Sequence, residues 1–463
     1  MSPPFRVIIV GGGLAGALLA NGLINNDVDV TVYERDEADS KREGYQIRIG
    51  EAASKGFDAC LTEERREAIR SRLGQSSQAT ATAPVIYTPQ FKPILDLASL
   101  AGYTKSAAIN RVVLRDALVE PVAKLGRVRY GMAFTGCDIA VGDDGRERVV
   151  VHFADGSSDT CDLLVGADGS GSKVNARVGA NNIIQIDTHA SFLNKGSLPI
   201  ERIKALPAEL RRAPLMTMGG GTNMFYGLYL PAPREETSVA KDTEIEVEYD
   251  VQNASFFWAL STPKSALPGG DVSKIENRLQ FCLDHIKHWA PEFKTMLSVG
   301  QEEGQTDNIV SIPVRVAKKL PERWREAARK KPGARPEEGH PRIWLIGDAI
   351  HAMQAGRGMG GNQSMQDCSE ALPAILKLNE IAKKGAPVST SQVAEVLEPF
   401  ESQMMKRTFE WVRKSGGTSM PTINLDGPLG TIVWLLGVIL VPIVNLLYGL
   451  GLVGAKKQKQ HID

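Results

Sequence analysis

Three glycines near the amino terminus have the spacing of a phosphate-binding turn. Gly11, Gly13 and Gly16 follow an apolar, β-branched run over residues 7–10 and precede a small-residue helical pattern over residues 14–23. The first glycine permits a tight turn, the second lets a pyrophosphate approach the backbone, and the third allows close packing of helix on strand. Free N–H groups at the helix N-terminus favour the anion. The segment therefore predicts a dinucleotide site.

A carboxylate follows at the position where the ribose of a dinucleotide would lie. A second apolar run, residues 28–33, leads directly to Glu34, roughly 20 residues past the glycines, where an acidic side chain accepts hydrogen bonds from a ribose hydroxyl. A glycine-rich turn without a ligand is the alternative interpretation of the glycines alone. The strand, the helix and Glu34 together favour the dinucleotide.

A second glycine-rich segment lies far downstream. Residues 344–351 read Trp-Leu-Ile-Gly-Asp-Ala-Ile-His, and residues 356–362 read Gly-Arg-Gly-Met-Gly-Gly-Asn. The two segments together suggest one flavin that is held at both ends. His351 could be a general base, but its place inside this motif favours a structural hydrogen bond.

Composition limits the class of partner. The chain has 463 residues, and 54 lysines and arginines balance 54 aspartates and glutamates, so no net positive field attracts nucleic acid. Small-molecule partners are expected. The five cysteines are scattered, without C-x-x-C or metal-ligand spacing, which predicts no metal site, a reducing (cytosolic) compartment and thiols that act as small core residues.

The carboxyl-terminal region has the composition of a membrane segment. No charge occurs from Leu429 to Val453, and three lysines follow at 456, 457 and 459. A helix of that length would span about 37 Å, enough to cross a hydrocarbon core of about 30 Å with some tilt. Pro442 and Asn445 interrupt the pattern, so an in-plane or hairpin segment remains open, as does a buried helix pair. Membrane association is favoured, because such a segment is hard to bury inside a domain.

The pattern changes between the two glycine-rich segments. Residues 51–72 are charge-rich and helical, and residues 108–118 have apolar residues at helical spacing, with Arg111 ahead of the helix body. Residues 161–172 read as a buried strand that breaks into a glycine turn carrying Asp168. Short strands are then expected at 223–230 and 246–260, separated by proline and charged turns. They indicate a mostly antiparallel sheet that forms a separate substrate-side layer.

Taken together, these motifs resemble the single-component FAD-dependent aromatic-hydroxylase-like monooxygenases, over roughly residues 5–415. The resemblance assigns Glu34 and Arg35 to an AMP-binding turn, Arg111 to an FAD contact, and Asp168 and Gly169 to a motif linked with FAD and NADPH. It also assigns Asp348 to the ribityl or pyrophosphate end of FAD. The loop that faces the pyrimidine edge of the flavin would be Gly358, Met359, Gly360, Gly361 and Asn362.

Two departures from the family pattern bear on the reaction. The family continues the Asp168 motif with a serine and then an arginine, whereas this chain has Ser172 followed by Asn175, which puts the NADPH contact in doubt. A proline pair usually lies beside the flavin, and here those positions are Gln354 and Ala355. The pocket near the reactive face of the flavin is therefore expected to differ in shape.

The resemblance implies a reaction and a substrate class. NAD(P)H would reduce the flavin, O₂ would form a flavin hydroperoxide, and one oxygen atom would hydroxylate or epoxidise a small molecule, while the protein positions the substrate and excludes water. The tail and the similarity to tail-bearing fungal pathway monooxygenases favour a hydrophobic secondary-metabolite intermediate.

Two residues are candidates for catalytic roles in the expected pocket. Arg48 alternates with Gln46 along residues 44–50 and is expected to orient the flavin or the substrate; an exposed strand arginine is the alternative. Tyr226, within residues 224–230, could donate a hydrogen bond into the pocket, although a structural tyrosine is favoured.

The expected architecture is an α/β, Rossmann-like FAD-binding fold with an inserted substrate sheet. The FAD domain would comprise residues 1–180 and 310–415, the sheet residues 181–309, and the linker and tail residues 416–463. The alternative function is a membrane-tethered flavoprotein of the same fold that acts as a reductase or a non-catalytic FAD binder. A flavin-dependent halogenase is disfavoured, because its Trp-x-Trp-x-Ile-Pro signature is missing and residues 257–259, Phe-Trp-Ala, are the nearest approach.

Overall fold

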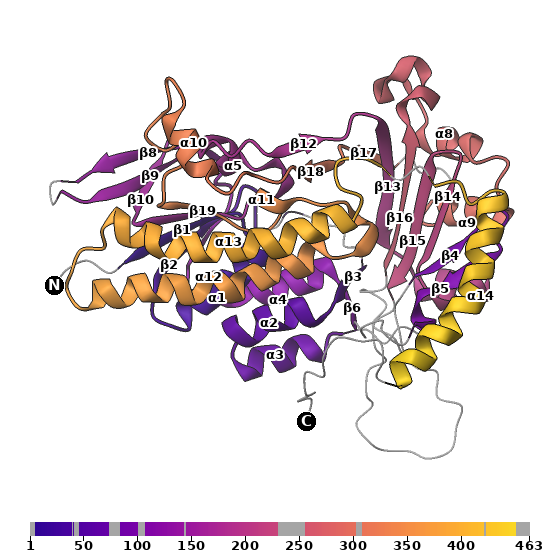
Figure 1. Ribbon diagram of the computed structural model, residues 1–463, viewed down its shortest axis with the longest axis horizontal. Coiled ribbons are helices and arrows are strands. Elements are labelled where there is room, and N and C mark those ends of the chain that lie inside the picture. The colour runs from indigo at the N-terminus through magenta and orange to yellow at the C-terminus, as the bar shows by residue number, and fades with distance from the viewer. Residues whose placement is uncertain are drawn as a thin grey trace.

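The computed structural model describes residues 5–38, 40, 46–73, 84–100, 107–142, 145–229, 255–301, 308–420 and 423–450. Two large sheets organise this part of the chain, one in each half of the molecule (Figure 1). Short strands β3 (Gln46–Ile49) and β6 (Ala107–Asn110) pair with each other between the two halves.

The first sheet is parallel throughout and carries the amino-terminal strand at its centre. Val7 of β1 pairs with Leu163 on one side and with Val30 on the other. Four of the five β1 residues are buried, as expected for a β-branched strand covered on both faces. The strand order is β19 (Ile343–Leu345), β11 (Leu163–Gly166), β1 (Arg6–Val10), β2 (Asp29–Tyr33) and β7 (Val128–Arg129).

Helices and a small sheet cover the two faces of this parallel sheet (Figure 1). On one side lie α1 (Leu14–Ile24), α2 (Glu51–Cys60), α3 (Glu63–Arg70), α4 (Arg111–Lys124), α12 (Gly360–Lys383) and α13 (Thr390–Lys414). On the other lie the antiparallel strands β8 (Phe134–Val141), β9 (Glu147–Phe153) and β10 (Ser158–Cys161). Shorter elements are α5 (Lys173–Arg177), β12 (Ile183–Gln185), β18 (Arg315–Ala317), α10 (Trp324–Lys330) and α11 (Asp348–His351).

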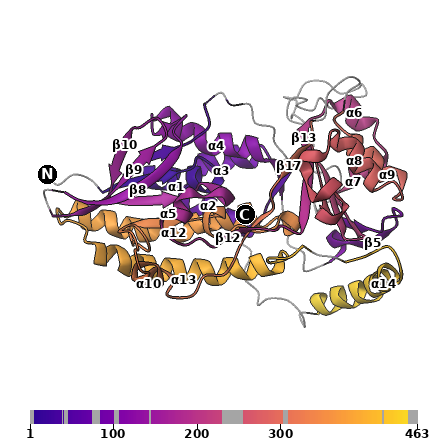
Figure 2. The same ribbon diagram turned by 90° about the horizontal axis from the view of Figure 1, so that it is seen from above.

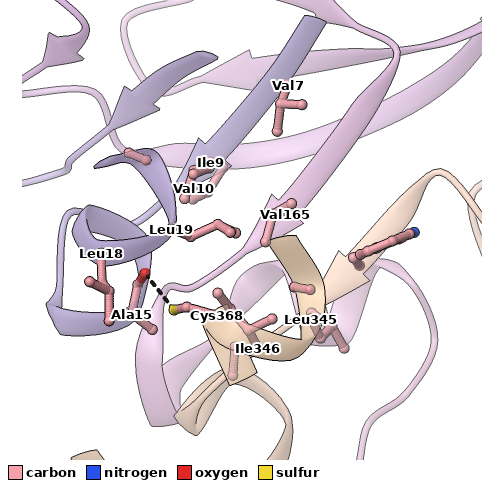
Figure 3. Packing of buried hydrophobic residues seen from close by; sticks show 14 of the residues in the cluster. Val7, Ile9, Val10, Ala15, Leu18, Leu19, Val165, Leu345, Ile346 and Cys368 are labelled. Carbon is pink, nitrogen blue, oxygen red and sulfur yellow. Dashed lines mark hydrogen bonds between the residues drawn. The ribbon is translucent and has the colours of Figure 1, made fainter. Parts of the chain in front are cut away.

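The core of this half joins segments from both ends of the chain. Figure 3 shows β1, α1, β11 and β19 packing together, with Val10, Leu19, Val165 and Leu345 among the buried side chains. The Cys368 thiol of α12 donates a hydrogen bond of 3.2 Å to the carbonyl of Ala15 in α1. All five cysteines are buried and free, as the sequence predicts.

The second sheet is mostly antiparallel, as the sequence predicts. Helices α6 (Ile200–Lys204), α7 (Ala208–Arg212), α8 (Arg278–His285) and α9 (Pro291–Ser298) cover one face (Figure 2). The strand order is β17 (Val310–Ile312), β13 (His189–Ser197), β16 (Ser255–Pro263), β15 (Thr222–Tyr229), β14 (Leu215–Gly219), β4 (Val85–Tyr87) and β5 (Pro93–Asp96).

The chain enters the second sheet earlier than the expected insertion at residue 181. Strand β4 pairs parallel with β14, with Val85 opposite Leu215, and β5 pairs with β4 at the edge. Strand β17 adds a further strand after residue 309. Local periodicity does not show which sheet a strand joins, so the second sheet includes residues on both sides of the expected 181–309 range. The strand expected at 246–260 begins at Ser255, and residues 246–254 lie outside the described part.

The carboxyl-terminal apolar region forms one helix, α14 (Pro428–Gly449), long and apolar enough to cross a membrane. The helix continues through Pro442, so neither an interruption there nor a hairpin occurs within the described residues. It lies along the outer side of the second sheet, next to β5 (Figures 1 and 2). The helix is largely exposed, so the expected alternative of a buried helix pair is wrong.

Candidate cofactor and active site

The turn after β1 has the geometry that its glycines predict. Gly11 has a φ of +107°, and a Cβ there would lie 2.4 Å from the carbonyl oxygen of Ala167. A Cβ on Gly16 would lie 2.0 Å from the carbonyl oxygen of Gly11. A Cβ on Gly13, which caps α1, would meet nothing within 4 Å. Side chains are therefore excluded where the turn packs, while the backbone at Gly13 is open to a ligand such as a pyrophosphate.

Glu34 lies at the end of β2 with its carboxylate turned toward this turn. It is buried and accepts hydrogen bonds from the N–H of Gly12 at 2.9 Å and of Asp36 at 3.1 Å. Arg115 of α4, which the sequence gave no reason to select, approaches it at 3.6 Å and donates 2.9 Å to the carbonyl of Gly12. One buried nitrogen of Arg115, Nη2, has no hydrogen-bond partner among the described residues. That donor fits an additional polar ligand beside Glu34.

Arg35 does not share this buried position. Its side chain is 78% exposed, with its Nε 3.5 Å from the carboxylate of Asp36. The structure thus places Arg35 on the surface beside the expected AMP end, where any contact with a cofactor would be solvent-accessible.

The Asp168 turn packs directly against the first glycine turn, because Gly11 contacts the backbone of Ala167 and Asp168. Asp168 accepts hydrogen bonds from the hydroxyl of Ser172 at 2.5 Å and from the N–H of Lys173 at 2.8 Å. Burial raises the pKa of the Asp168 carboxyl, and these hydrogen bonds oppose the rise. Gly169 follows with a φ of +77°. The aspartate therefore stabilises its own loop and the start of α5.

Asn175, which replaces the arginine of the family pattern, points into the protein. It is 3% exposed, and its side-chain amide donates 2.8 Å hydrogen bonds to Asn182 and to the carbonyl of Ala349. One of these bonds connects α5 with α11, and the other connects α5 with the segment before β12. The side chain cannot serve as the surface contact for NADPH that the family's arginine would provide.

The downstream segment brings Asp348 to the start of α12. Asp348 begins α11 after Gly347, whose φ is +61°. A Cβ on Gly360 would lie 3.7 Å from the Asp348 carboxylate, and one on Gly361 would lie 3.6 Å from the side chain of Leu14 in α1. The N-termini of α1 and α12 therefore meet, although they are far apart in sequence. This convergence is the arrangement that a flavin held at both ends requires.

Asp348 combines solvent access with a crowded environment. Its side chain is exposed, yet desolvation by the surrounding protein raises the pKa of its carboxyl, and the positive charges of His351 and Arg111 oppose this rise. A carboxylate that is accessible but closely surrounded by protein can accept hydrogen bonds from the hydroxyls of a bound ligand. Arg111, the first residue of α4, is also exposed and acts on the same carboxylate.

A buried network of charged side chains holds the backbone turn that carries Asp348. His351 is fully buried, and its Nε2 lies 2.6 Å from Asp367 of α12. Asp367 also accepts a hydrogen bond of 2.8 Å from the N–H of Gly347 and one of 2.8 Å from Arg407 of α13. Burial would raise the pKa of Asp367, but His351 and Arg407 outweigh it and lower that pKa. Asp367 therefore remains ionised and fixes the backbone of the turn that carries Asp348.

Asn362 links the loop at α12 to the β3 strand. Its side-chain oxygen accepts 2.8 Å from the N–H of Gly50, and its amide donates 2.6 Å to the carbonyl of Arg48 and 3.0 Å to that of Gly358. Gly358 has a φ of +62° and precedes Met359, which caps α12. The amide of Asn362 holds the loop against β3, so its contribution to the cofactor site is to position the neighbouring backbone.

Arg48 lies on β3 and is half-buried, opposite Ala108 of β6. It belongs to the strand pair between the two sheets, because β3 contacts β15 and β16. The structure thus brings Arg48, Arg111, Asp348 and the start of α12 to one region.

Tyr226 does not face that region. It is fully buried and pairs across the sheet with Leu215 and Trp258, in the hydrophobic core under α8 and α9. Burial raises the pKa of the Tyr226 hydroxyl. The prediction that Tyr226 donates into the pocket is wrong, because strand alternation turns even-numbered residues of β15 toward the helices. Its burial in this core favours the structural alternative.

We expect Asp367→Asn to weaken the cofactor site through the turn at Gly347. Loss of the charge leaves buried His351 and Arg407 without their shared carboxylate, which costs about 3–5 kcal/mol of folding free energy. Denaturant unfolding and the flavin content of the purified protein would measure both effects. Glu370→Gln is the matched control, because Glu370 binds Arg407 at 2.8 Å and no contact joins it to His351 or Gly347 within the described residues. Equal flavin retention in both variants would contradict the role of Asp367.

Comparison with known proteins agrees with this geometry. Residues 5–201 match the family model of the FAD binding domain. A dual O-methyltransferase/FAD-dependent monooxygenase of Phaeosphaeria nodorum is 22% identical over 448 residues, covering 88% of this chain and 45% of that protein. The chain thus spans about half the length of the first relatives it matches. An FAD-dependent monooxygenase of Aspergillus terreus is 26% identical, covering 83% of this chain and 93% of its own.

Solved structures show the same fold. HpxO of Klebsiella pneumoniae, solved with FAD and uric acid, superposes with a TM-score of 0.63 at 16% identity, covering 95% of this chain and 96% of its own. A 2,6-dihydroxypyridine-3-hydroxylase of Arthrobacter nicotinovorans superposes with a TM-score of 0.62 at 13% identity, covering 92% and 96%. Residues 5–201 thus match an FAD binding domain, and over most of its length the chain is similar in sequence to FAD-dependent monooxygenases and shares the fold of these solved structures.

Proposed function

We propose that the protein uses NAD(P)H and O₂ to hydroxylate or epoxidise a hydrophobic small molecule, a secondary-metabolite intermediate, on a bound FAD. The observation that carries the proposal is the convergence of Glu34 and the Gly13 turn with Asp348 and the start of α12. Glu34 and Gly13 would hold the adenosine and pyrophosphate end of FAD, and Asp348 the ribityl end. Bound FAD would supply the redox and oxygen chemistry, while the chain binds and orients the reactants.

The substrate is proposed to bind on the face of the second sheet that looks toward β3 and β6. The side-chain amide of Asn110 in β6 donates a hydrogen bond of 3.2 Å to the hydroxyl of Ser255 in β16, so Ser255 lies on this face. Odd-numbered residues of β15 and β16 share it, and the rings of Phe225 and Phe257 lie there with centroids 6.0 Å apart, both half-buried. Partly open aromatic surface beside the flavin region suits an apolar substrate.

Assays on the purified full-length protein separate this proposal from the alternatives. The protein, loaded with FAD, would be offered polyketide and terpenoid intermediates, with NADPH and NADH compared as reductants. We expect substrate-dependent consumption of reduced nicotinamide and transfer of one ¹⁸O atom from ¹⁸O₂ into product. Reduction of the flavin without labelled product would favour a reductase, and bound FAD that is never reduced would favour a non-catalytic FAD binder.

Arg48 provides a test of the proposed active face. Arg48→Ala should lower the product formed per NADPH consumed more than it lowers the free energy of unfolding, since a half-buried side chain beside the flavin contributes positioning and little core burial. Arg70→Ala on α3 is the control, because that arginine is exposed and paired with Glu63 and Glu67. Unchanged coupling in Arg48→Ala would support the exposed-strand alternative.

We also propose that α14 associates with a membrane, with the catalytic part on the cytosolic side. Deletion from Pro428 onward should release the protein into the supernatant, while FAD and turnover of a soluble substrate persist, because the flavin region ends before α13. Fractionation without detergent measures the first effect and flavin content the second. Full-length protein in the supernatant would contradict the anchor, and a truncated protein that aggregates without flavin would make α14 part of the core.

A further inference from the structure

The structure fixes α14 to the second sheet along the whole length of β5. Ahead of the helix, Asp426 accepts 2.5 Å from Gln90, in the turn before β5. In mid-helix, a Cβ on Gly437 would lie 3.3 Å from the carbonyl oxygen of Ile94. Near the end, Asn445 donates 2.7 Å to the carbonyl of Ser99, beyond β5. Asp426, Gly437 and Asn445 therefore all lie against the part of the protein that carries β5.

The rest of the helix surface is apolar and uncovered. Large side chains such as Trp434, Ile439 and Leu446 are between 46% and 63% exposed. The helix has 22 residues and no charged side chain, so the uncovered surface extends for about 33 Å. Exposed apolar side chains on soluble proteins are usually scattered, whereas those of α14 follow one another along the whole helix. Hydrocarbon is the partner that matches its length and its lack of charge.

We infer that α14 stays docked on β5 and lies in the plane of the membrane surface, with one side on the protein and the other in the acyl layer. The inference rests on the membrane association proposed above and states its mode. A lipid bilayer is the occupant, and the helix does not cross it.

Charged groups beside β5 argue against a docked helix that crosses the membrane. Lys92 is exposed just before β5, and Asp96 at its end lies 3.3 Å from Arg212. If docked α14 crossed a bilayer, these charges would be drawn to membrane depth, where charged side chains are strongly disfavoured. Among the described residues β5 has a strand partner on one side only, so its other edge would also lose water without gaining a partner. An in-plane helix keeps both in the aqueous phase.

Asn445 supports the same arrangement. A side-chain amide in lipid needs a partner, and the carbonyl of Ser99 supplies one only while the helix is docked. A crossing helix that left the sheet would carry this amide into hydrocarbon without that bond.

The side of the membrane on which the chain ends distinguishes the two modes. A Lys459→Cys variant would be labelled with a membrane-impermeant maleimide in sealed microsomes whose cytosolic face points outward. The native thiols are buried and give little background. Glu64→Cys, at an exposed position of α3, reports the side of the catalytic part. We expect both sites to react without detergent.

Labelling of Lys459→Cys only after detergent, while Glu64→Cys reacts at once, would overturn the inference and leave the membrane anchor intact. Protein that does not sediment with the microsomes would instead refute the anchor itself, and the inference with it. The two failures are therefore distinguishable.

A second pair of variants tests docking directly. Gly437→Leu places a side chain against β5, whereas Gly449→Leu adds the same group where a Cβ meets nothing within 4 Å. Hydrogen exchange of the β5 and Ser99 region would be compared on the membrane-bound enzyme. We expect faster exchange in Gly437→Leu only. Identical exchange in both variants would show that α14 leaves the sheet in the membrane and would overturn the inference.

Discussion

Asp348→Ala is expected to yield protein that folds but loses most of its FAD during purification. The exposed Asp348 carboxylate, beside the start of α12, would otherwise accept hydrogen bonds from the ribityl end of the cofactor. Hydrogen bonds to a charged group contribute about 1.5–3 kcal/mol, which corresponds to a dissociation constant raised roughly 10- to 150-fold. Titration of the apoprotein with FAD, followed by flavin fluorescence, measures the change.

Asp348→Asn separates charge from hydrogen bonding at the same position. The amide keeps an acceptor of similar size, so its affinity for FAD should lie between those of Asp348→Ala and the unaltered protein. Thermal unfolding of the apoproteins should change little, because Asp348 is exposed. If Asp348→Ala binds FAD as tightly as the unaltered protein and turns over at the same rate, the proposed contact between Asp348 and FAD is wrong.

Glu34→Ala should weaken FAD binding by a comparable factor from the opposite end of the cofactor. Its buried carboxylate holds the N–H of Gly12 at 2.9 Å and is proposed to accept a ribose hydroxyl as well. Removal also leaves Arg115 without its nearby carboxylate, so the free energy of unfolding should fall too. Equilibrium binding of FAD and denaturant unfolding of the apoprotein, measured together, resolve the two effects.

Two controls isolate the ribose contact. Glu120→Gln alters an exposed carboxylate on the same helix as Arg115, paired with Lys124, and should leave FAD affinity unchanged. Glu34→Gln keeps an acceptor for Gly12 while it removes the charge, and should retain more stability than Glu34→Ala. Full FAD occupancy at the original affinity in Glu34→Ala would refute the ribose assignment.

The structural features that the sequence predicted correctly are those fixed by local geometry. Gly11 and Gly16 are required because a Cβ at either position would collide with backbone, and this requirement leaves a spacing that the sequence displays. The parallel strands β1 and β2 follow from their short β-branched runs in the same way. The glycine turn after a buried strand that places Asp348 at the start of α11 is equally local.

Features that depend on distant contacts were missed. Nothing in the sequence near Arg115, Asp367 or Arg407 separates them from ordinary charged helix residues, and their roles arise only when α4, α12 and α13 pack. The orientation of Tyr226 was ambiguous, because a strand with aromatic residues on both faces does not show which face the helices cover.

Asn175 illustrates how a departure from a family pattern becomes informative only in the structure. The sequence showed an asparagine in place of an arginine, and the structure shows that this amide is buried and hydrogen-bonded to Asn182 and Ala349. Any approach of NAD(P)H must therefore use other residues in this chain.

The flavin content of the purified full-length protein tests the central claim most directly. The protein would be denatured, and the flavin that it releases would be measured by absorbance. Fluorescence before and after treatment with phosphodiesterase would distinguish FAD from FMN. A cradle built from both ends of the chain predicts a single FAD per chain, with occupancy that falls in both Glu34→Ala and Asp348→Ala. Protein that purifies without flavin and fails to bind added FAD, or that binds it equally well after both substitutions, would contradict the account.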